Sequence, residues 1–265
     1  MSRIINKLKR IKTEMKWKSD ADKYKRIIQQ HNIRREFIGK NIWVLMPHSD
    51  DEWIGCSQLL CSQPDTIHVI NMNMPGGDDE TLHKERKREL MEMAEKFGYR
   101  VTLVDDSEHL YSLLIKEAPE IVFLPSFLDW HTEHHLVNEK FEEVAKTVAF
   151  SGDIGMYQIS IPLPAEFINA GCSMTKEELL NKWRLFVEVY KTQTIIPIKR
   201  FQFNEMINGA VSGSFAMEAY SILSFENWLK IKKRFTLSDS EICEIKANIN
   251  DIDRIRKIIE KKVRR

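Results

Sequence analysis

Two short segments of this sequence carry side chains that can hold a metal ion and transfer protons. The first is residues 47–52, with the sequence PHSDDE, and the second is residues 129–134, with the sequence DWHTEH. Zn²⁺ binds imidazole and carboxylate groups readily, and two imidazoles with one carboxylate leave a coordination position open to water. An open site of this kind activates water for hydrolysis. The two segments therefore point to metal-dependent hydrolysis, provided that the fold brings them together.

Each segment follows an apolar run of strand length and precedes a helical pattern. Residues 42–46 come before the first segment, and residues 121–124 come before the second. In a parallel sheet, the connections at the carboxyl ends of the strands open at one edge, where such folds place their ligands. Acidic groups at a helix N-terminus also suit the helix dipole. We therefore expect these side chains to converge: His48, Asp50, Asp51, His131, His134 and His135.

Each segment taken alone also has a purely structural interpretation. A single histidine on a helix is usually a packing or surface residue, and paired acids at a helix start often only cap the helix. Two such segments after two different strands favour a shared site instead. His68, His83 and His109 have no comparable neighbours in the sequence, and we interpret them as structural or surface residues. The role of His135 is left open, because it lies on a different helix face from His134.

Strand-like runs alternate with helical patterns from residue 41 to residue 161, which predicts an α/β fold. The expected architecture is a Rossmann-like, mostly parallel sheet with helices on both faces and helical extensions at the two ends of the chain. After residue 164 the pattern weakens. There we expect a helix at 175–190 that begins with a capping box of Thr175 and Glu178. We also expect a short strand at 195–198, a loop at 209–214 and a sheet or lid element at 216–223.

The regular elements expected before residue 164 are the strands 42–46, 67–72, 100–104, 121–124 and 155–161 and the helices 51–61, 81–97, 108–117 and 133–150.

The chain divides by charge and pattern into a basic helical extension at residues 1–40, an α/β body at 41–224 and a C-terminal helical extension at 225–265. The first region has 13 Lys and Arg against 4 Asp and Glu, and the remainder has 27 against 35. A basic amphipathic helix can rest on an anionic membrane or on a partner protein. It can also fold back onto the acidic body or pair in a homo-oligomer. We favour this second interpretation, since no lipidation motif accompanies the helix.

The composition predicts a protein of the cytoplasm, with peripheral membrane contact through residues 1–40 as one option. No apolar run is long enough to cross a bilayer, and the N-terminus lacks the apolar core of a secretion signal. The four cysteines form no C-x-x-C pair, so we expect reduced thiols. Neither G-x-G-x-x-G nor a P-loop is present, so nucleotide binding has no motif support and we expect no nucleic-acid partner.

The two segments resemble the PIG-L/LmbE family of metal-dependent N-deacetylases, of the GlcNAc-PI de-N-acetylase type. Its members usually have H-P-D-D-E after the first strand and H-P-D-H before a later helix. Three other stretches match more weakly, in the same order as in the family, and the resemblance covers roughly residues 41–223. They are residues 85–89 (ERKRE), similar to R-x-x-E-L, residues 190–193 (YKTQ), similar to H-x-S-Q, and residues 216–220 (AMEAY), similar to A-E-A-F.

The sequence departs from the family pattern at several places. Ser49 stands where a proline is usual, and Glu133 stands where an aspartate is usual. Ser57 and Gln58 replace a common Gly-Gly pair, and Tyr190 replaces a common histidine. These changes leave the expected chemistry in place, but they make the exact substrate harder to infer.

The resemblance implies that His48, Asp51 and His134 hold the metal and that Asp50 is the general base. The metal would be Zn²⁺, or another divalent ion such as Fe²⁺. Because Zn²⁺ lowers the pKa of bound water to about 7, a neighbouring carboxylate can take its proton at neutral pH. Asp50 and Asp51 are adjacent on a tight turn, so one can ligate the metal while the other faces the water.

Three further side chains complete the expected site. His131, as imidazolium, would stabilise the tetrahedral oxyanion or protonate the leaving amine. Asp129 would orient His131 and raise its pKa. Arg86 would contact a sugar hydroxyl or a phosphate near the mouth of the site. For Asp129 and Arg86 the structural alternatives are a loop-capping carboxylate and a solvated helix charge.

The expected activity is removal of the acetyl group from an N-acetylated amino sugar or sugar conjugate by metal-activated water. The main alternative is a non-catalytic binding or scaffold protein of the same fold, docked through its basic extension to a membrane-associated assembly for glycan synthesis. A third option is a metal hydrolase that acts on another amide or an ester. Whether the sugar is free, nucleotide-linked, lipid-linked or polymeric stays open at this stage.

Overall fold

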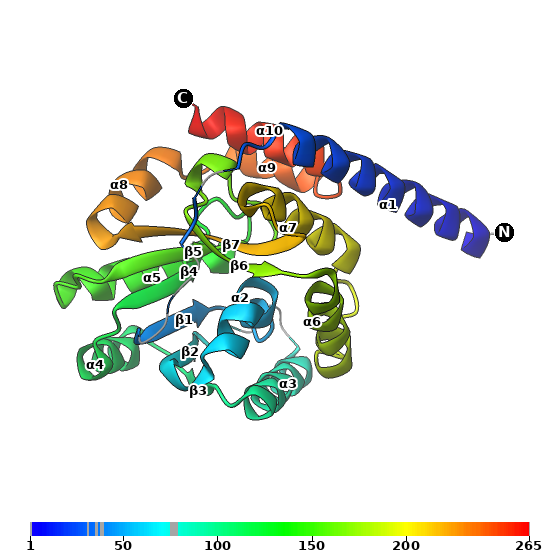
Figure 1. Cartoon of the computed structure of the whole chain (residues 1–265). Coiled ribbons are helices and arrows are strands. Elements are labelled where there is room, and N and C mark those ends of the chain that lie inside the picture. Colours follow the sequence, from blue (N-terminus) through cyan, green and yellow to red (C-terminus); the bar gives the residue numbers. More distant parts are fainter. Residues whose placement is uncertain (1, 31, 35–36, 38–39, 75–78, 265) are drawn as a thin grey trace.

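The computed structural model describes residues 2–30, 32–34, 37, 40–74 and 79–264. They form a seven-stranded sheet with the strand order β3-β2-β1-β4-β5-β7-β6. Strands β1 to β5 are parallel to one another, whereas β7 runs antiparallel to both β5 and β6. Figure 1 shows α4 and α5 on one side of the sheet and α3 and α6 on the other. The predicted α/β, mostly parallel architecture is confirmed.

The strands are β1 Ile42–Met46, β2 Ile67–Asn71, β3 Arg100–Leu103, β4 Ile121–Pro125, β5 Asp153–Tyr157, β6 Ala170–Met174 and β7 Ala216–Ser224. The α-helices are α1 Ser2–Ile27, α2 Asp51–Ser62, α3 Glu80–Phe97, α4 Ser107–Glu117, α5 Thr132–Thr147, α6 Lys176–Val189, α7 Ile198–Ser212, α8 Phe225–Phe235, α9 Asp239–Ala247 and α10 Ile252–Val263. Two short 3₁₀ helices are Pro64–Thr66 and Ala165–Phe167.

The central strand β1 is buried on both faces because successive side chains of a strand point to opposite sides. Ile42, Val44 and Met46 pack with residues of α2, α3 and α6 in one core. Trp43 and Leu45 pack with residues of α4, α5, α8 and α10 in the other. This double burial is typical of a parallel strand covered by helices on both sides, and it explains the uninterrupted apolar run in the sequence.

The direction of the chain changes at β1, and this change fixes the position of the site. From β1 the chain steps outward to β2 and β3, and it then returns to the other side of β1 to form β4 and β5. The connections that follow β1 and β4 therefore leave the sheet in opposite directions and open a crevice between them. Doubly wound folds bind their ligands in this crevice. The two segments with metal-ligand side chains are these two connections.

The helix and strand predictions before residue 164 are confirmed to within a few residues at each end. Two details of local chemistry are also confirmed. Gly98 ends α3 with a φ of 79°, a conformation that favours glycine. Thr175 and Glu178 form the predicted capping box at the start of α6.

The predictions between residues 195 and 214 are wrong. The structure has neither a strand at 195–198 nor a loop at 209–214, because helix α7 occupies Ile198–Ser212. Gly209 suggested a turn, but it serves close packing inside the helix. A Cβ atom there would lie 2.7 Å from the Cα of Ala216, so only glycine lets α7 approach β7 so closely. The turn glycine is Gly213, which ends the helix with a φ of 72°.

Strand β6 was not predicted, whereas helix α8 lies at the start of the region 225–265 that was expected to be helical. Strand β6 has the sequence AGCSM, which lacks the β-branched and aromatic residues that mark strands. It is held in the sheet by antiparallel pairing with β7, from Ala170 opposite Tyr220 to Met174 opposite Ala216. The expected helical stretch at the C-terminus is divided into α9 and α10.

The second half of α1 folds back onto the body, whereas its first half does not. Trp17, Ala21 and Tyr24 are buried, and Trp17 Nε1 donates to the carbonyl oxygen of Asn250 at 2.8 Å. Two ion pairs join α1 to the start of α10, Lys16 with Asp251 at 2.8 Å and Lys23 with Asp253 at 2.5 Å.

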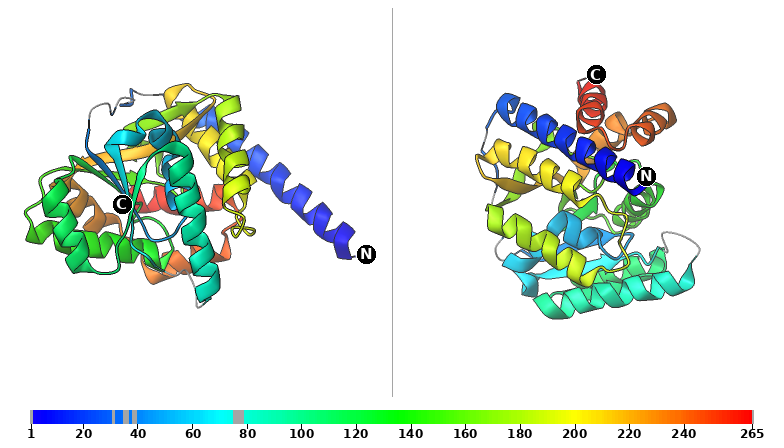
Figure 2. Two further views of the ribbon diagram at one scale, coloured as in Figure 1. Left: turned by 90° about the horizontal axis from the view of Figure 1, so that it is seen from below. Right: turned by 90° about the vertical axis from the view of Figure 1, so that its right-hand side faces the viewer.

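Figures 1 and 2 show the N-terminal half of α1 extending beyond the rest of the molecule. Its apolar side chains Ile5, Leu8, Ile11 and Met15 are exposed. None of the helices in the described residues combines the length and apolar character needed to span a bilayer.

Candidate functional site

The turn after β1 buries two adjacent carboxylates beside a histidine. Asp50 and Asp51 are 5% and 2% exposed, and Asp51 begins α2. The side chain of Asp50 makes no hydrogen bond to the helix N-terminus, so it does not act as a capping residue. Oδ2 of Asp51 lies 3.1 Å from Nδ1 of His48 and also accepts the backbone N–H of His48 at 3.3 Å. The turn therefore holds His48 and Asp51 together and leaves the Asp50 carboxylate uncommitted to the helix.

The connection after β4 is organised by the carboxylate of Asp129. This side chain is 1% exposed and accepts backbone N–H groups from Trp130 at 2.7 Å, His131 at 3.1 Å and Ser160 at 3.0 Å. Its Oδ2 also lies 3.3 Å from Nδ1 of His134, in the first turn of α5. A carboxylate beside one ring nitrogen fixes the orientation of the other nitrogen.

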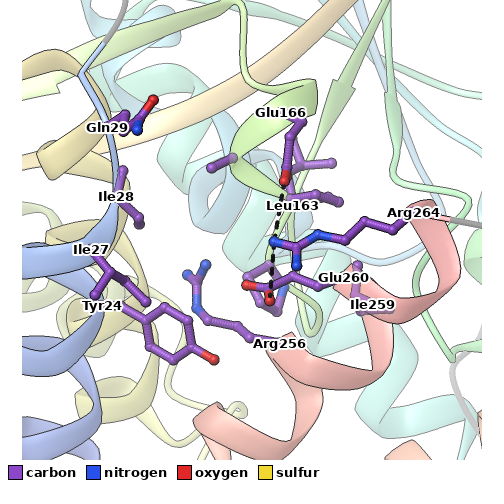
Figure 3. A pocket seen from close by; sticks show the side chains of 13 residues that line it. Tyr24, Ile27, Ile28, Gln29, Leu163, Glu166, Arg256, Ile259, Glu260 and Arg264 are labelled. Atoms are coloured by element: carbon purple, nitrogen blue, oxygen red, sulfur yellow. Dashed lines mark ion pairs between the residues drawn. The ribbon is translucent and has the colours of Figure 1, made fainter.

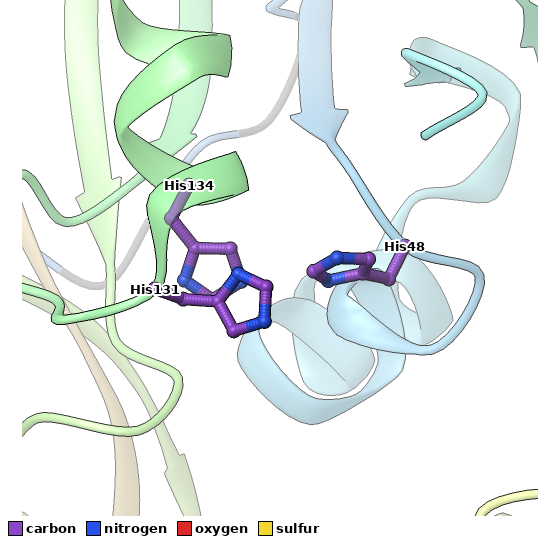
Figure 4. A group of neighbouring side chains, drawn as sticks. All are labelled: His48, His131 and His134. Carbon is purple, nitrogen blue, oxygen red and sulfur yellow. The ribbon is translucent and has the colours of Figure 1, made fainter. Parts of the chain in front are cut away.

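The side chains from the two connections meet. Ligand atoms of His48, His131 and His134 lie within 4.8 Å of one another, and Figure 4 shows the three rings gathered between α5 and the turn after β1. Nε2 of His134 lies 3.5 Å from Oδ2 of Asp51. The ring of His48 has a carboxylate at each nitrogen. Asp51 faces Nδ1, and Oε2 of Glu133 lies 2.5 Å from Nε2.

This donor set fits a divalent metal ion. Imidazole nitrogens and a carboxylate oxygen are the ligands of open zinc sites. Oδ2 of Asp51 is the donor atom that lies close to both imidazoles, since it faces Nδ1 of His48 and Nε2 of His134. The structure thus brings together the three residues for which the sequence suggested metal binding, and it adds His131 as a fourth nearby donor.

The two adjacent carboxylates have opposite pKa shifts. Burial raises the pKa of Asp50 to about 7, and the negative charge of Asp51 adds to this effect. Burial also opposes ionisation of Asp51, but His134 and His48 outweigh it and hold its pKa below the usual range. Asp51 is therefore a stable anion suited to a cation, and Asp50 can exchange a proton near neutral pH.

The histidines of the cluster also differ from one another. Burial opposes protonation of all three, but Asp51 and Glu133 raise the pKa of His48 to about 9, and Asp129 and Asp51 raise that of His134 to about 10. The pKa of His131 is lowered by burial and by the other two histidines. This lowered pKa disfavours the imidazolium form that was expected for His131 and favours the neutral ring.

Burial lowers the pKa of His131 overall, but the charge of Asp129 acts to raise it, as expected. The side chain of Asp129 binds the backbone of His131, however, and the ring that it approaches is that of His134. Nδ1 of His131 instead accepts the backbone N–H of Glu133 at 3.3 Å. This leaves Nε2 to carry the proton of the neutral imidazole. His135, whose role was left open, has Nε2 2.6 Å from the carbonyl oxygen of Asp129 and supports the loop.

A cavity of about 470 Å³ adjoins the cluster. Arg86 lines it, as expected, and its Nε is buried without a hydrogen-bond partner. Arg200 also lines it and was not predicted. It is 3% exposed and donates to the carbonyl oxygen of Ile249, and burial lowers its pKa to about 10. The other walls are formed by Ile54, Trp130, Ile159, Ser160, Gln193, Ile195, Ile196, Pro197, Phe201, Ile249 and Asn250.

A buried network supports α2 from behind. Lys182 is 1% exposed, and its Nζ donates to Ile54 O at 2.7 Å, Glu205 Oε1 at 2.5 Å and Glu218 Oε1 at 2.7 Å. Its carbonyl oxygen accepts from Trp53 Nε1 at 3.0 Å. The network ties the first turns of α2 to α6, α7 and β7, so it fixes the helix that begins with Asp51.

Glu52 lies buried under the turn, where two tyrosine hydroxyls contact it. It is 0% exposed and accepts from the hydroxyl of Tyr99 at 3.1 Å and from the hydroxyl of Tyr190. Burial raises its pKa to about 8, although the hydrogen bond from Tyr190 acts in the opposite direction. Tyr190, where a histidine is usual, therefore contacts Glu52 behind the metal-ligand cluster.

Comparison with known proteins places this fold beside several solved structures. No protein-family model matches the sequence, and no curated protein matches it. A conserved protein from Thermus thermophilus superposes with a TM-score of 0.55 at 17% identity, over 69% of this chain and 94% of that chain. The zinc-inhibited form of teicoplanin deacetylase Orf2 gives 0.51 at 11% identity, over 70% and 99%. The A40926 pseudoaglycone deacetylase Dbv21 gives 0.50 at 14% identity, over 70% and 98%. At these identities the likeness establishes the fold.

Proposed function

We propose that this chain is a metal-dependent hydrolase that removes the acetyl group from an N-acetylated amino sugar or sugar conjugate. The observation that carries the proposal is the convergence of His48, Asp51 and His134 beside a cavity of about 470 Å³. Two of the structures with the same fold are deacetylases. The sequence motifs of the two connections add support, since they resemble those of the PIG-L/LmbE N-deacetylases.

In this proposal, the residues that would hold the metal are His48 through Nδ1, Asp51 through its carboxylate and His134 through Nε2. A Zn²⁺ ion at this position would supply Lewis-acid activation of both a water molecule and the amide carbonyl. Asp129 keeps the ring of His134 in the orientation that presents Nε2. The neighbour in a zinc-inhibited form makes Fe²⁺, Co²⁺ and Mn²⁺ worth testing beside Zn²⁺.

Asp50 is proposed as the general base. Its pKa of about 7 lets it accept a proton at neutral pH and release it again within one turnover. It takes the proton of the attacking water while the water oxygen bonds to the acyl carbon. It then delivers this proton to the amide nitrogen as the C–N bond breaks. The products are acetate and the free amine.

His131 is proposed to stabilise the oxyanion. Its Nδ1 is occupied by the backbone N–H of Glu133, so Nε2–H is the group that can donate to the substrate. A neutral donor serves this purpose, because the group must hydrogen-bond to charge that develops only in the transition state. Arg86 and Arg200 line the same cavity and would bind hydroxyl or anionic groups of the sugar conjugate.

We further propose that residues 41–224 form the catalytic body and that the regions 1–40 and 225–265 are extensions of it. The C-terminal extension contributes to the cavity, since Ile249 and Asn250 line it. The N-terminal extension is proposed to touch an anionic membrane surface through its exposed half. A cytoplasmic enzyme that acts on membrane-proximal conjugates would fit this arrangement.

The test is acetate release from a panel of N-acetylglucosamine conjugates, with each of the four metals supplied in turn. Asp50→Asn should keep its metal and lose about 10²- to 10⁴-fold in kcat, the usual range for a general base. Asp65→Asn, at an exposed aspartate, is the control and should be unchanged. Equal rates for wild type and Asp50→Asn would overturn the mechanism. Wild-type protein that neither binds metal nor releases acetate would favour the scaffold alternative.

A further inference from the structure

A second cavity lies between α1, α10 and the connection from β5 to β6. Its volume is about 350 Å³, within the range of small-molecule sites. Figure 3 shows the side chains around it. Apolar groups form much of the wall, and none of its residues lines the cavity beside the histidine cluster. The wall is made by Tyr24, Ile27, Ile28, Gln29, Pro162, Leu163, Pro164, Ala165, Glu166, Arg256, Ile259, Glu260 and Arg264.

The unusual group in this cavity is the guanidinium of Arg256. The residue is 5% exposed, and its Nε is buried without a hydrogen-bond partner. Its nearest recorded acceptor is Oδ1 of Asn204, 3.5 Å from NH2, at the limit of a hydrogen bond. Within the described part of the chain, no carboxylate forms an ion pair with it. Figure 3 shows this guanidinium directed away from α10, toward the space between Tyr24 and Leu163.

No other charged group of the cavity forms an ion pair with Arg256. Arg264 lies near both acids, 3.8 Å from Glu166 and 3.9 Å from Glu260. The ring of Tyr24 lies 5.2 Å from the Arg256 guanidinium, a cation–π contact that gives Nε–H no acceptor. Burial lowers the pKa of Arg256 to about 10, in spite of the opposing effects of Tyr24 and Glu260. The guanidinium nevertheless keeps its charge at neutral pH.

A buried cation without an anion is costly, and natural proteins normally pair such a group. A guanidinium matches the two oxygens of a carboxylate or a phosphate, which it binds through parallel N–H groups. We propose that this cavity binds a small organic anion, with its carboxylate or phosphate on Arg256 and its apolar part against Ile27, Leu163 and Ile259. The site is separate from the proposed deacetylase centre, and it would hold α1 and α10 together around the ligand.

The test uses the full chain and four probes: inorganic phosphate, hexanoate, hexyl phosphate and the uncharged hexanol. Binding is followed by titration calorimetry and by the shift of Tm. We expect hexanoate or hexyl phosphate to bind and to raise Tm, and hexanol to do neither. The comparison of hexanoate with hexyl phosphate identifies the anionic group, and inorganic phosphate shows whether the apolar part is needed.

Arg256→Met removes the guanidinium, and Arg254→Met on the exposed face of α10 is the matched control. We expect Arg256→Met to weaken anion binding by at least tenfold, and Arg254→Met to leave it unchanged. Without ligand, Arg256→Met should be at least as stable as wild type, because it removes an uncompensated charge. The Tm of Arg256→Met should not rise when an anion is added.

Two results would overturn the proposal. The first is that none of the three anions binds the wild-type protein. The second is that Arg256→Met binds them as well as wild type does. A marked loss of Tm in Arg256→Met without ligand, together with no anion effect in wild type, would assign Arg256 a purely structural role. Because Asp50→Asn should bind the same anions unchanged, failure of the deacetylase proposal is distinguishable from failure of this one.

Discussion

Nε2 of His134 lies 3.5 Å from Oδ2 of Asp51, although the two residues belong to different strand-to-helix connections. The contact exists because β1 and β4 are neighbours in the sheet while the chain leaves them in opposite directions. Each residue is also fixed on its second side, Asp51 by His48 and His134 by Asp129. The proposed metal position is thus determined before any ion binds, which is the condition for a well-ordered catalytic site.

Metal binding should separate the roles of His134 and His131. We expect His134→Ala to lose stoichiometric metal, because it removes a proposed ligand in the middle of the site. His131→Ala should keep the metal and lose activity, since His131 is proposed to donate to the substrate. Zinc titration against a chromophoric chelator measures the bound metal of each variant, and acetate release measures its activity. His109→Ala, at an exposed histidine of α4, is the control. Loss of metal in His131→Ala would instead make His131 a ligand.

Asp129→Asn should weaken metal binding without abolishing it. The substitution keeps the size of the side chain but removes the negative charge beside Nδ1 of His134. Partners of this kind typically contribute 10- to 100-fold in metal affinity, and we expect a loss of about that size. The same chelator titration measures it. An unchanged affinity would show that Asp129 only shapes the loop through its backbone hydrogen bonds.

The buried Lys182 network should be a major source of stability. Lys182→Met leaves Glu205 and Glu218 buried without their cation, and breaking such a pair costs about 3–5 kcal/mol. Lys230→Met breaks an exposed pair with Glu226 and should change the free energy of unfolding far less, because water and salt screen such a pair. Urea unfolding of the two variants compares them. Similar losses would mean that the network does not stabilise the α2 region.

His68 should make the protein less stable in mild acid. It lies buried on β2, with its ring nitrogens 2.8 Å from Glu117 Oε2 and 2.7 Å from Thr102 Oγ1. Burial lowers its pKa, in spite of the hydrogen bond to Glu117. Below about pH 6.5 the unfolded chain therefore binds a proton that the native protein still excludes, and stability falls as the pH falls through the native pKa.

His68→Gln removes this titration and can keep both hydrogen bonds. We expect the free energy of unfolding to fall less in the variant than in wild type between about pH 7 and about pH 5.5. Urea unfolding at several pH values across this range measures the difference. Parallel curves for the two proteins would contradict the assignment.

The exposed half of α1 should bind anionic vesicles. Leu8 and Met15 are 61% and 68% exposed, with basic residues around them. We expect the full chain to sediment with vesicles of equimolar phosphatidylserine and phosphatidylcholine but not with phosphatidylcholine alone. High salt should weaken the binding, since it screens the charges. Leu8→Ser with Met15→Ser should abolish it. A dimer in solution that this double variant dissociates would show instead that a second copy covers the helix.

The half of the molecule that holds the candidate site was predictable because its signals are local. The apolar run before His48 and the run before His131 both have strand length, and parallel strands present their carboxyl ends at one edge. That geometry alone predicts that the two connections meet. The proposed roles of Asp50 and Asp51 were separated by the family resemblance and not by their position alone. Their surroundings differ because His48 and His134 contact Asp51, which is a tertiary property.

The remaining elements depend on contacts between distant parts of the chain. Strand β6 is held in the sheet by its pairing with β7, and Gly209 is needed within α7 because β7 packs so closely against the helix there. Arg200 and Arg256 had the sequence signature of ordinary surface charges. Both arginines are buried because of the way α7 and α10 pack against the rest of the molecule. The spacing of apolar residues in the sequence does not predict this packing.

Asn250 belongs to the C-terminal extension, yet it lines the cavity beside the histidine cluster and its carbonyl oxygen accepts from Trp17 of α1. One wall of this cavity is therefore formed by segments that flank the α/β body. Under the proposed function, changes in these segments would alter which molecules enter without changing the turns that carry the proposed catalytic groups. A version trimmed to residues 41–224 should then lose substrate selectivity before it lost those groups.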